Sequence, residues 1–535
     1  MILKNFFYIC ITAIVLSSCN SNLDYEGKAI FRYNEPSGIS TLDPAFSKEQ
    51  SIIWAVNQIF NGLVQMDNEL NVEPSIAKSW QISEDGLIYT FNLKQDVFFH
   101  TNDIFENGTR AVVAKDFKFS FERLIASKEA TPGAWVFQKV SSFEATNDTT
   151  FKVILKEPFT PFLGLLTMKY CSVVPKEIVE KLGDQFGRNP IGTGPFKMKL
   201  WVDNEKLVLL KNELYFEKEN GIQLPYLDAI AISFIPDEQS AFLEFSKGKM
   251  DFISGLDAGY KDELLKADGT LQTAYESRLT LNTLPYLNTE YLGINMQSKH
   301  PALQNLKFRQ ALNYAINKEE MVKYLRNNIG TAAQAGMVPN GLPGFSKQTD
   351  YGYSFNSNTA KQLLLESEIN LKTIPTLDIV TTANYRDLCE YVQNAWQKVG
   401  IPVNVNVVPS SHLRELKANG EADIFRASWI ADYPDAENYL SLFYSKNFCP
   451  NGPNYTHFKN TEFDALYEKA LSETNTETRH AYYQRMDRLI IESAVVVPLY
   501  YDRVLRFTNK KISGFESNAM NLLDLKRVRK SVIIF

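Results

Sequence analysis

A run of alternating apolar and less apolar residues predicts a β-strand near residue 90. Its apolar positions are Leu87, Tyr89, Phe91 and Leu93. This spacing is that of a strand with one buried face, and the turn dipeptide Asp85-Gly86 is placed to begin it. Nothing in the run carries catalytic chemistry. His100, which follows it without a second histidine nearby, is interpreted as a packed or loop residue rather than a ligand.

Two later segments have apolar residues at helical spacing. Within residues 306–325, the apolar residues Ala311, Leu312, Ala315 and Ile316 follow Phe308 by three, four, seven and eight positions, which places them on one helical face. The second face is formed by Leu388, Tyr391, Val392, Ala395, Trp396 and Val399. Gly400 can cap that helix and Pro402 stops it before an alternating strand at residues 403–407. A helix followed directly by a strand predicts α/β units.

Composition is that of a large folded protein. The 535 residues are 44% hydrophobic and 22% charged, and this length predicts two to four domains. The net charge of −6 becomes −7 without residues 1–18, whose single charge is Lys4, and this argues against a nucleic-acid or anionic-membrane surface. Cys171, Cys389 and Cys449 follow no pairing motif, so one disulfide is allowed but not assigned.

The amino terminus resembles a bacterial lipoprotein signal. Lys4 gives a positive start, residues 6–16 are an apolar run too short to span a bilayer, and Leu16-Ser17-Ser18-Cys19 ends it like a lipobox. Cleavage would leave Cys19 as the first residue, and two or more acyl chains there would make a stable anchor. The alternative is an ordinary signal peptide with an incidental cysteine. The mature chain is expected in the bacterial envelope, facing the periplasm and tethered to a membrane.

Residues 77–123 resemble the signature region of the extracytoplasmic solute-binding proteins, family 5, that feed peptide ABC transporters. The matching positions are Ala77, Ser79, Trp80, Asp85-Gly86, Tyr89 to Leu93, Phe99-His100, Asp116-Phe117, Phe119-Ser120 and Arg123. The segment departs from the family pattern after His100, where residues 101–108 lengthen one surface loop. Residues 191–196, Ile-Gly-Thr-Gly-Pro-Phe, also match the family, and their glycines lack phosphate-loop spacing.

The resemblance implies an α/β, two-lobed periplasmic binding protein fold, type II-like and of cluster C, with an extra domain inserted in the first lobe. Carried onto this chain, the signal peptide is 1–18, and the first lobe comprises 19–60, 186–278 and 502–535. The inserted domain is 61–185 and the second lobe is 279–501. A monomer is expected, with no cofactor and no metal.

Asp432 is the candidate closest to function. It follows the apolar strand around Ile424-Phe425 and stands among Trp429, Ala431 and Tyr433, where a cleft is expected. By resemblance, the aspartate at this position takes the free α-amino group of a bound peptide. A desolvated ammonium needs such a partner. The residues alone also allow Asp432 to cap a turn before Pro434.

The rest of the peptide would be held through its backbone, as an extended strand between the lobes, so broad side-chain tolerance is expected. By family position, further contacts are expected from Ser47, Gln50, Ala431 and Tyr455. Trp429 and Tyr433 are expected to bind the ligand beside Asp432. Arg386 is a candidate for the ligand carboxylate. It could instead lie in a helix start beside Asp387, and the cleft would then admit longer peptides.

Enzymatic functions find little support. The five histidines form no HExxH or close metal-ligand pair, there is no GxSxG elbow, and the spacing suggests no Cys-His arrangement. The resemblance implies a permease and ATPase complex as partners and no catalysis. Nickel chelates, haem or oligosaccharides are alternative ligands within the family, and an envelope peptide sensor or chaperone without a transporter is an alternative of another class.

Overall fold

The computed structural model describes residues 27–126, 131–255, 260–342, 344–346 and 351–531. The predicted signal segment and Cys19 lie outside the described residues. Within the described ranges, no helix combines the length and the apolarity needed to cross a membrane.

A mixed sheet forms the centre of the molecule. In the described part of the chain it has eleven strands, in the order β17-β16-β18-β14-β19-β13-β1-β12-β9-β8, with β15 paired to β19. The strands are β1 (Ile30–Asn34), β8 (Phe196–Val202), β9 (Lys206–Lys211), β12 (Ala229–Ser233), β13 (Phe252–Ser254), β14 (Leu279–Ile294), β15 (Thr331–Ala332), β16 (Leu377–Thr381), β17 (Val403–Val407), β18 (Ile424–Ile430) and β19 (Val496–Asn509).

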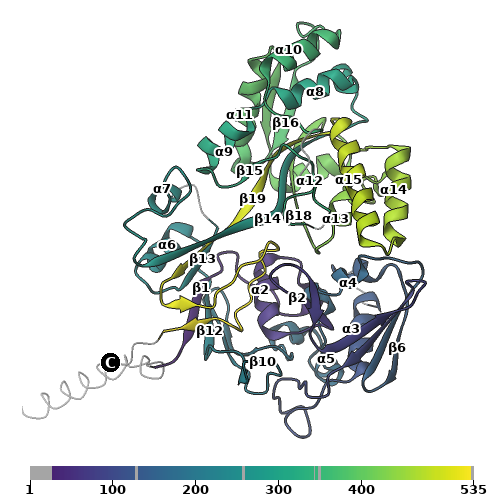
Figure 1. The fold of residues 1–535 in the computed structure, drawn as a ribbon. Helices are drawn as coiled ribbons and strands as arrows, with labels where there is room; N and C mark the ends of the chain where they lie inside the picture. The colour runs from purple at the N-terminus through teal and green to yellow at the C-terminus, as the bar shows by residue number, and fades with distance from the viewer. Residues whose placement is uncertain (1–26, 127–130, 256–259, 343, 347–350, 532–535) are drawn as a thin grey trace, which may run out of the picture.

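Two long antiparallel strands, β14 and β19, run through both halves of the molecule (Figure 1). Residues 279–285 pair with 503–509, and residues 289–293 pair with 496–501, with a register shift between Pro285 and Thr289. We call the body around β1 the lower lobe and the body around β18 the upper lobe. Because both strands belong to both lobes, they form the structural link between them. The domain boundaries given by the resemblance stay a prediction.

Helices cover both faces of the upper-lobe sheet. Leu292 packs on one face with Phe308 and Trp396, whereas the next residue along the strand, Tyr291, packs on the other face with Tyr439 and Tyr483. Neighbouring strand residues point to opposite faces, so β14 is buried on both. The upper-lobe helices are α8 (Leu306–Tyr314), α9 (Lys318–Arg326), α10 (Ser357–Glu366), α11 (Arg386–Gln397), α12 (Ser410–Ala418), α13 (Glu437–Leu440), α14 (Thr461–Ser472) and α15 (Thr476–Glu492).

The lower lobe carries a second, four-stranded sheet, in the order β4-β5-β7-β6. Its strands are β4 (Ala77–Ile82), β5 (Ile88–Leu93), β6 (Val140–Asn147) and β7 (Thr150–Leu155). Three two-stranded sheets pair β2 (Val64–Met66) with β3 (Val72–Pro74), β10 (Lys218–Glu219) with β11 (Ile222–Gln223), and β20 (Ile512–Ser513) with β21 (Arg529–Lys530). The lower-lobe helices are α2 (Gln50–Ile59), α3 (Ala114–Ala126), α4 (Phe162–Leu165), α5 (Lys176–Leu182), α6 (Glu238–Ser246) and α7 (Lys261–Leu264).

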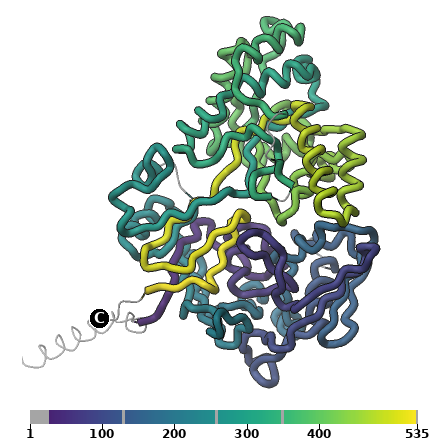
Figure 2. Tube along the Cα trace, in the orientation of Figure 1, coloured from purple at the N-terminus to yellow at the C-terminus, as the bar shows by residue number. Residues whose placement is uncertain are grey.

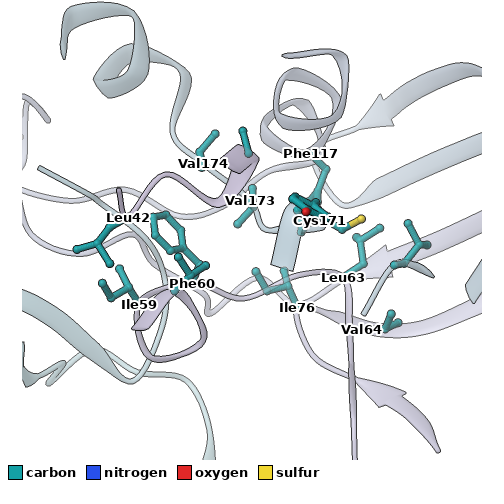
Figure 3. Close-up of a cluster of buried hydrophobic side chains, with 14 of the residues drawn as sticks. Leu42, Ile59, Phe60, Leu63, Val64, Ile76, Phe117, Cys171, Val173 and Val174 are labelled. Atoms are coloured by element: carbon teal, nitrogen blue, oxygen red, sulfur yellow. The ribbon is translucent and has the colours of Figure 1, made fainter. Parts of the chain in front are cut away.

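Segments far apart in the sequence share the lower-lobe core. Figure 3 shows Leu42 and Phe60 from the start of the described chain in the same buried cluster as Phe117 of α3 and Cys171. The C-terminal segment packs on α2, where the Gln58 amide donates to the Leu523 carbonyl at 2.7 Å. The first and last parts of the described chain therefore lie side by side, as the purple and yellow segments of Figure 2 show.

The predicted strand and the second predicted helix are confirmed. Tyr89, Phe91 and Leu93 are the buried face of β5. Helix α11 ends as expected, and Gly400 adopts a positive φ of 91° before β17. The segment 306–325 differs from one continuous helix. Asn317 interrupts it and caps α9 by accepting a hydrogen bond from the Glu320 N–H, because its side chain competes with the helical backbone.

His100 is a packed histidine, as the sequence indicated. It is buried, its Nε2 lies 3.0 Å from the Gly194 carbonyl, and burial lowers its pKa to about 4. Its backbone N–H donates to the Gly192 carbonyl at 2.7 Å, which ties the signature segment to the Ile-Gly-Thr-Gly-Pro-Phe loop. That loop passes so close to α2 that a Cβ on Gly194 would lie 2.4 Å from the Ile59 carbonyl carbon. Its glycines therefore serve a close backbone approach.

Candidate functional site

The loop that follows β18 presents Asp432 at the boundary between the lobes. Asn438, at the second position of α13, organises this loop. Its Oδ1 accepts hydrogen bonds from the Trp429 indole N–H at 2.8 Å and from the Asp432 backbone N–H at 3.1 Å. Its Nδ2 donates to the Asp432 carboxylate at 3.3 Å. The Asp432 carboxylate is thereby held in one place while retaining free acceptor capacity.

Asp432 is exposed to solvent, although neighbouring protein atoms crowd its carboxyl. Partial burial raises the pKa of its carboxyl above the ordinary value, and the bond from Asn438 opposes this shift. Across the boundary, Tyr170 of the lower lobe has a pKa raised to about 12, chiefly by burial and secondarily by the charge of Asp432. Among the described residues, no Lys or Arg forms an ion pair with Asp432. The geometry offers an unpaired carboxylate to a cationic group.

Tyr433, which the sequence placed among the ligand contacts, packs between the lobes. It is 4% exposed and belongs to the lower-lobe core, with its ring 6.4 Å from that of Trp135. Its hydroxyl donates to Glu437. A second contact lies nearby, where the Thr160 N–H donates to the Leu471 carbonyl at 2.9 Å. The Asp432 loop is therefore next to a direct contact between the two lobes.

A cleft of about 780 Å³ opens between the lobes beside β14 and β19. The lower lobe contributes Gln50 and Trp54 of α2, and the upper lobe contributes Arg326 of α9 and Tyr385. This volume is within the usual range for small-molecule sites. Gln50 is thus placed in the interlobe cleft, where the sequence predicted a ligand contact. Asp432 is not among the residues that line this cleft.

Arg386 is the first residue of α11 and is exposed to solvent. Its neighbours Tyr385 and Asp387 line the cleft, but Arg386 itself does not. The structure therefore places it at a helix start, the alternative position considered from the sequence.

A different arginine, Arg426 of β18, lies behind Tyr385. It is buried and forms an ion pair with Glu290 of β14. Its guanidinium carbon lies 3.1 Å from the centre of the Tyr385 ring. The ion pair and the aromatic ring occupy this cation and hold it away from solvent.

The remaining predicted contacts have varied surroundings. Ser47 is 1% exposed, and its hydroxyl donates to the Pro44 carbonyl at 2.7 Å. Ala431 is buried, and its N–H donates to the Leu287 carbonyl at 2.9 Å. Tyr455 is half-buried, and the Lys417 ammonium lies 4.8 Å from the centre of its ring. The structure thus brings Trp429, Ala431 and Asp432 together in one loop and leaves Ser47 and Tyr455 elsewhere.

One inference from the sequence needs correction. Cys449 and His457 do come together, with Sγ 3.5 Å from Nε2, because the loop between them folds back. Burial raises the pKa of the Cys449 thiol and lowers that of His457. A neutral thiol beside a neutral imidazole is not an activated nucleophile. Cys171, Cys389 and Cys449 are all free and buried. In the described chain, no three His, Cys, Asp or Glu side chains are arranged to hold a metal ion.

Sequence reasoning missed Asn438, Tyr170 and the Glu290–Arg426 pair. A signal for the pair existed, since Glu290 and Arg426 are each the single charged residue of their strand. Asn438 follows Asp432 by only a few residues, but no pattern distinguishes it from other loop asparagines. Tyr170 is far from Asp432 in the sequence, and no local pattern relates the two residues.

Comparison with known proteins identifies the family. The model of "Bacterial extracellular solute-binding proteins, family 5 Middle" matches residues 71–448. The chain therefore belongs to the bacterial extracellular solute-binding proteins of family 5 and has their two-lobed fold. Family members bind solutes, and the matching proteins are described as binding proteins rather than as enzymes. They work outside the cytoplasm, several of them in the periplasm.

Similar proteins bind different solutes. Heme-binding protein A of Haemophilus influenzae is 27% identical over 86% of this chain and 84% of its own length. The dipeptide-binding protein of Escherichia coli is 26% identical over 85% of this chain and 86% of its own. The structure of the periplasmic binding protein DppA from Helicobacter pylori, in complex with the peptide STSA, covers 94% of this chain and 98% of its own, with 26% identity and a TM-score of 0.76.

Proposed function

We propose that the protein is the peptide-binding receptor of an ABC importer. In this proposal Asp432 holds the α-amino group of a short peptide between the lobes. A membrane permease with its ATPase receives the peptide, and lipid on Cys19 tethers the receptor to a membrane of the envelope. Residues 19–60, 186–278 and 502–535 form the first lobe, 61–185 the inserted domain and 279–501 the second lobe.

The unpaired Asp432 carboxylate is the observation that carries this proposal. An ammonium brought there would find an anion of fixed orientation in a partly desolvated site, near enough to Tyr170 of the lower lobe for the Asp432 charge to affect the pKa of that tyrosine. Removing one partner of such a pair typically costs about 2–5 kcal/mol. Neither a haem group nor a neutral oligosaccharide needs an amine partner at this position.

The interlobe cleft supports an extended ligand. Gln50 and Trp54 reach it from below, and Tyr385 and Arg326 reach it from above. Backbone hydrogen bonds contribute only about 0.5–1.5 kcal/mol each, so a few of them with the amine pair are enough for micromolar affinity. Arg386 does not line the cleft, and Arg426 is occupied by Glu290. This arrangement supports peptides longer than a dipeptide.

A ligand that touches both lobes would also favour closure. A ligand shifts an equilibrium between open and closed forms only if its free energy of binding differs between them. A peptide held by Asp432 in the upper lobe and by Gln50 in the lower lobe meets this condition. β14 and β19, which belong to both lobes, are the strands about which the lobes would move.

Native mass spectrometry of protein lacking residues 1–19, purified without denaturant, tests the proposal. We expect a ladder of released masses that match short peptides, lost in Asp432→Asn and kept in Asp378→Asn. Asp378 is an exposed aspartate on β16 of the same lobe, so its variant matches the change in charge. A protein that holds no peptide and takes up none, or that releases haem, a metal chelate or a sugar, would contradict the proposal.

A further inference from the structure

Glu35 is a carboxylate of the lower lobe that lines the interlobe cleft. It follows β1, which pairs in parallel with both β12 and β13. Its backbone is fixed, since its N–H donates to the Ser233 carbonyl at 2.9 Å and its carbonyl accepts from the Gly38 N–H at 3.0 Å. Ligands of open α/β sheets bind outside the carboxyl ends of parallel strands, and Glu35 stands at that edge.

The side chain of Glu35 is largely withdrawn from water. Only 9% of the residue is exposed, and burial raises its pKa to about 7 against the opposing effect of the Ser37 backbone N–H. A carboxylate in such a place is unfavourable in its charged form unless a cation accompanies it. The indole of Trp54 also lines the cleft, and the buried Arg506 guanidinium lies 5.7 Å from the centre of its ring, so this ring already accommodates a cation.

Among the described residues, two of the three cations that line the cleft have carboxylate partners. The Lys261 ammonium bonds Asn327 at 2.7 Å and Asp262 at 3.0 Å. Arg326 forms an ion pair with Asp502 at 3.1 Å, and the Arg503 Nε–H donates to the Thr283 hydroxyl at 3.0 Å.

Glu35 itself forms no ion pair with a Lys or Arg of the described residues. Across the cleft, the exposed Asp387 also has no such partner there, and its Oδ1 accepts the Leu388 N–H at 2.9 Å. The space between the lobes therefore contains two carboxylates that form no ion pair with a described Lys or Arg, and one of them is buried.

We propose that Glu35 is a second recognition carboxylate, which takes a cationic side chain of the bound ligand. The preferred substrates are then peptides with a lysine or arginine beyond their first residue. The inference rests on the proposed function, because it assumes that Asp432 takes the α-amino group. Asp432 does not line the cleft that contains Glu35, so the two carboxylates serve two different cations. They also belong to opposite lobes, so a basic peptide would bridge the lobes through charge.

Calorimetric titration with matched peptides tests this inference. The probes are pentapeptides with a free amine that carry one lysine at the second, third or fourth position, each compared with the same peptide carrying norleucine. At about pH 8 Glu35 is charged, and we expect the lysine peptide to bind at least about tenfold more tightly at one of these positions. Glu35→Gln should reduce the ratio of lysine-peptide affinity to norleucine-peptide affinity to about one. It should leave the affinity for the norleucine peptide unchanged.

Glu49→Gln is the matched control. Glu49 is an exposed carboxylate at the start of α2 that does not line the cleft, so its variant should keep the full lysine preference. Equal affinities for lysine and norleucine peptides, or a preference that survives Glu35→Gln, would overturn the inference and leave the proposed function standing. A protein that binds none of the peptides would overturn the proposed function, and the inference with it.

Discussion

Asn438 bonds Asp432 twice, accepting from its backbone N–H at 3.1 Å and donating to its carboxylate at 3.3 Å. The same asparagine accepts the Trp429 indole N–H at 2.8 Å. One buried amide therefore sets the positions of the carboxylate and of the indole beside it. Asn438 is a positioning residue for the proposed amine site.

Replacing this amide should weaken peptide binding. In Asn438→Ala the Asp432 carboxylate loses its donor and the loop loses two further bonds, so we expect peptide Kd to rise about tenfold. Calorimetry with one short peptide measures the change, and circular dichroism checks the fold. Asn419→Ala alters an exposed asparagine of the same lobe and should have no effect. An Asn438→Ala protein with unchanged Kd would show that the loop holds Asp432 without this residue.

The buried Glu290–Arg426 ion pair should matter for stability as a unit. Glu290 is 2% exposed and Arg426 is 8% exposed, so either single replacement leaves a charge in the interior. We expect Glu290→Gln or Arg426→Met to lower the free energy of unfolding by about 3–5 kcal/mol.

The double variant is the decisive comparison for this pair. It removes both charges, so it should lose much less stability than the two single changes added together. Urea unfolding followed by tryptophan fluorescence gives the values. If the double variant instead loses as much free energy of unfolding as the two single variants together, the two charges do not stabilise each other.

Asp487 should make stability depend on pH. It is 3% exposed, its carboxylate accepts the Met337 N–H at 2.8 Å, and burial raises its pKa to about 7 from 3.8. The folded protein therefore holds this proton more tightly than the unfolded chain. The contribution of Asp487 to stability is complete below about pH 4 and is lost as pH rises to about 7.

Asp487→Asn tests the sign of this effect. Across that pH range, the free energy of unfolding should fall less steeply with rising pH in the variant than in the wild type. The difference between the two slopes should correspond to at most about one bound proton. Urea unfolding at several pH values measures the slope, and Asp378→Asn should keep the slope of the wild type. A variant as pH-dependent as the wild type would exclude Asp487 as the titrating group.

The sequence by itself determined the local elements and the family. Tyr89, Phe91 and Leu93 fixed the buried face of β5, and Gly400 with Pro402 fixed the end of α11, because period and backbone restriction are local properties. The position of Asp432 just after a strand was also readable. The spaced matches in residues 77–123 indicated the family that the comparison then showed.

Only the tertiary structure decided which residues meet. Tyr170 lies close enough to Asp432 for its pKa to respond to that charge, and Tyr433 packs into the opposite lobe, because chain segments distant in sequence fold against one another. Cys449 reaches His457 because the short loop between them folds back. The environment of Glu35 has the same origin, since its burial comes from strands and helices scattered along the chain. A sequence pattern records which side chains are available. Contact, burial and the resulting pKa values depend on the three-dimensional packing that surrounds them.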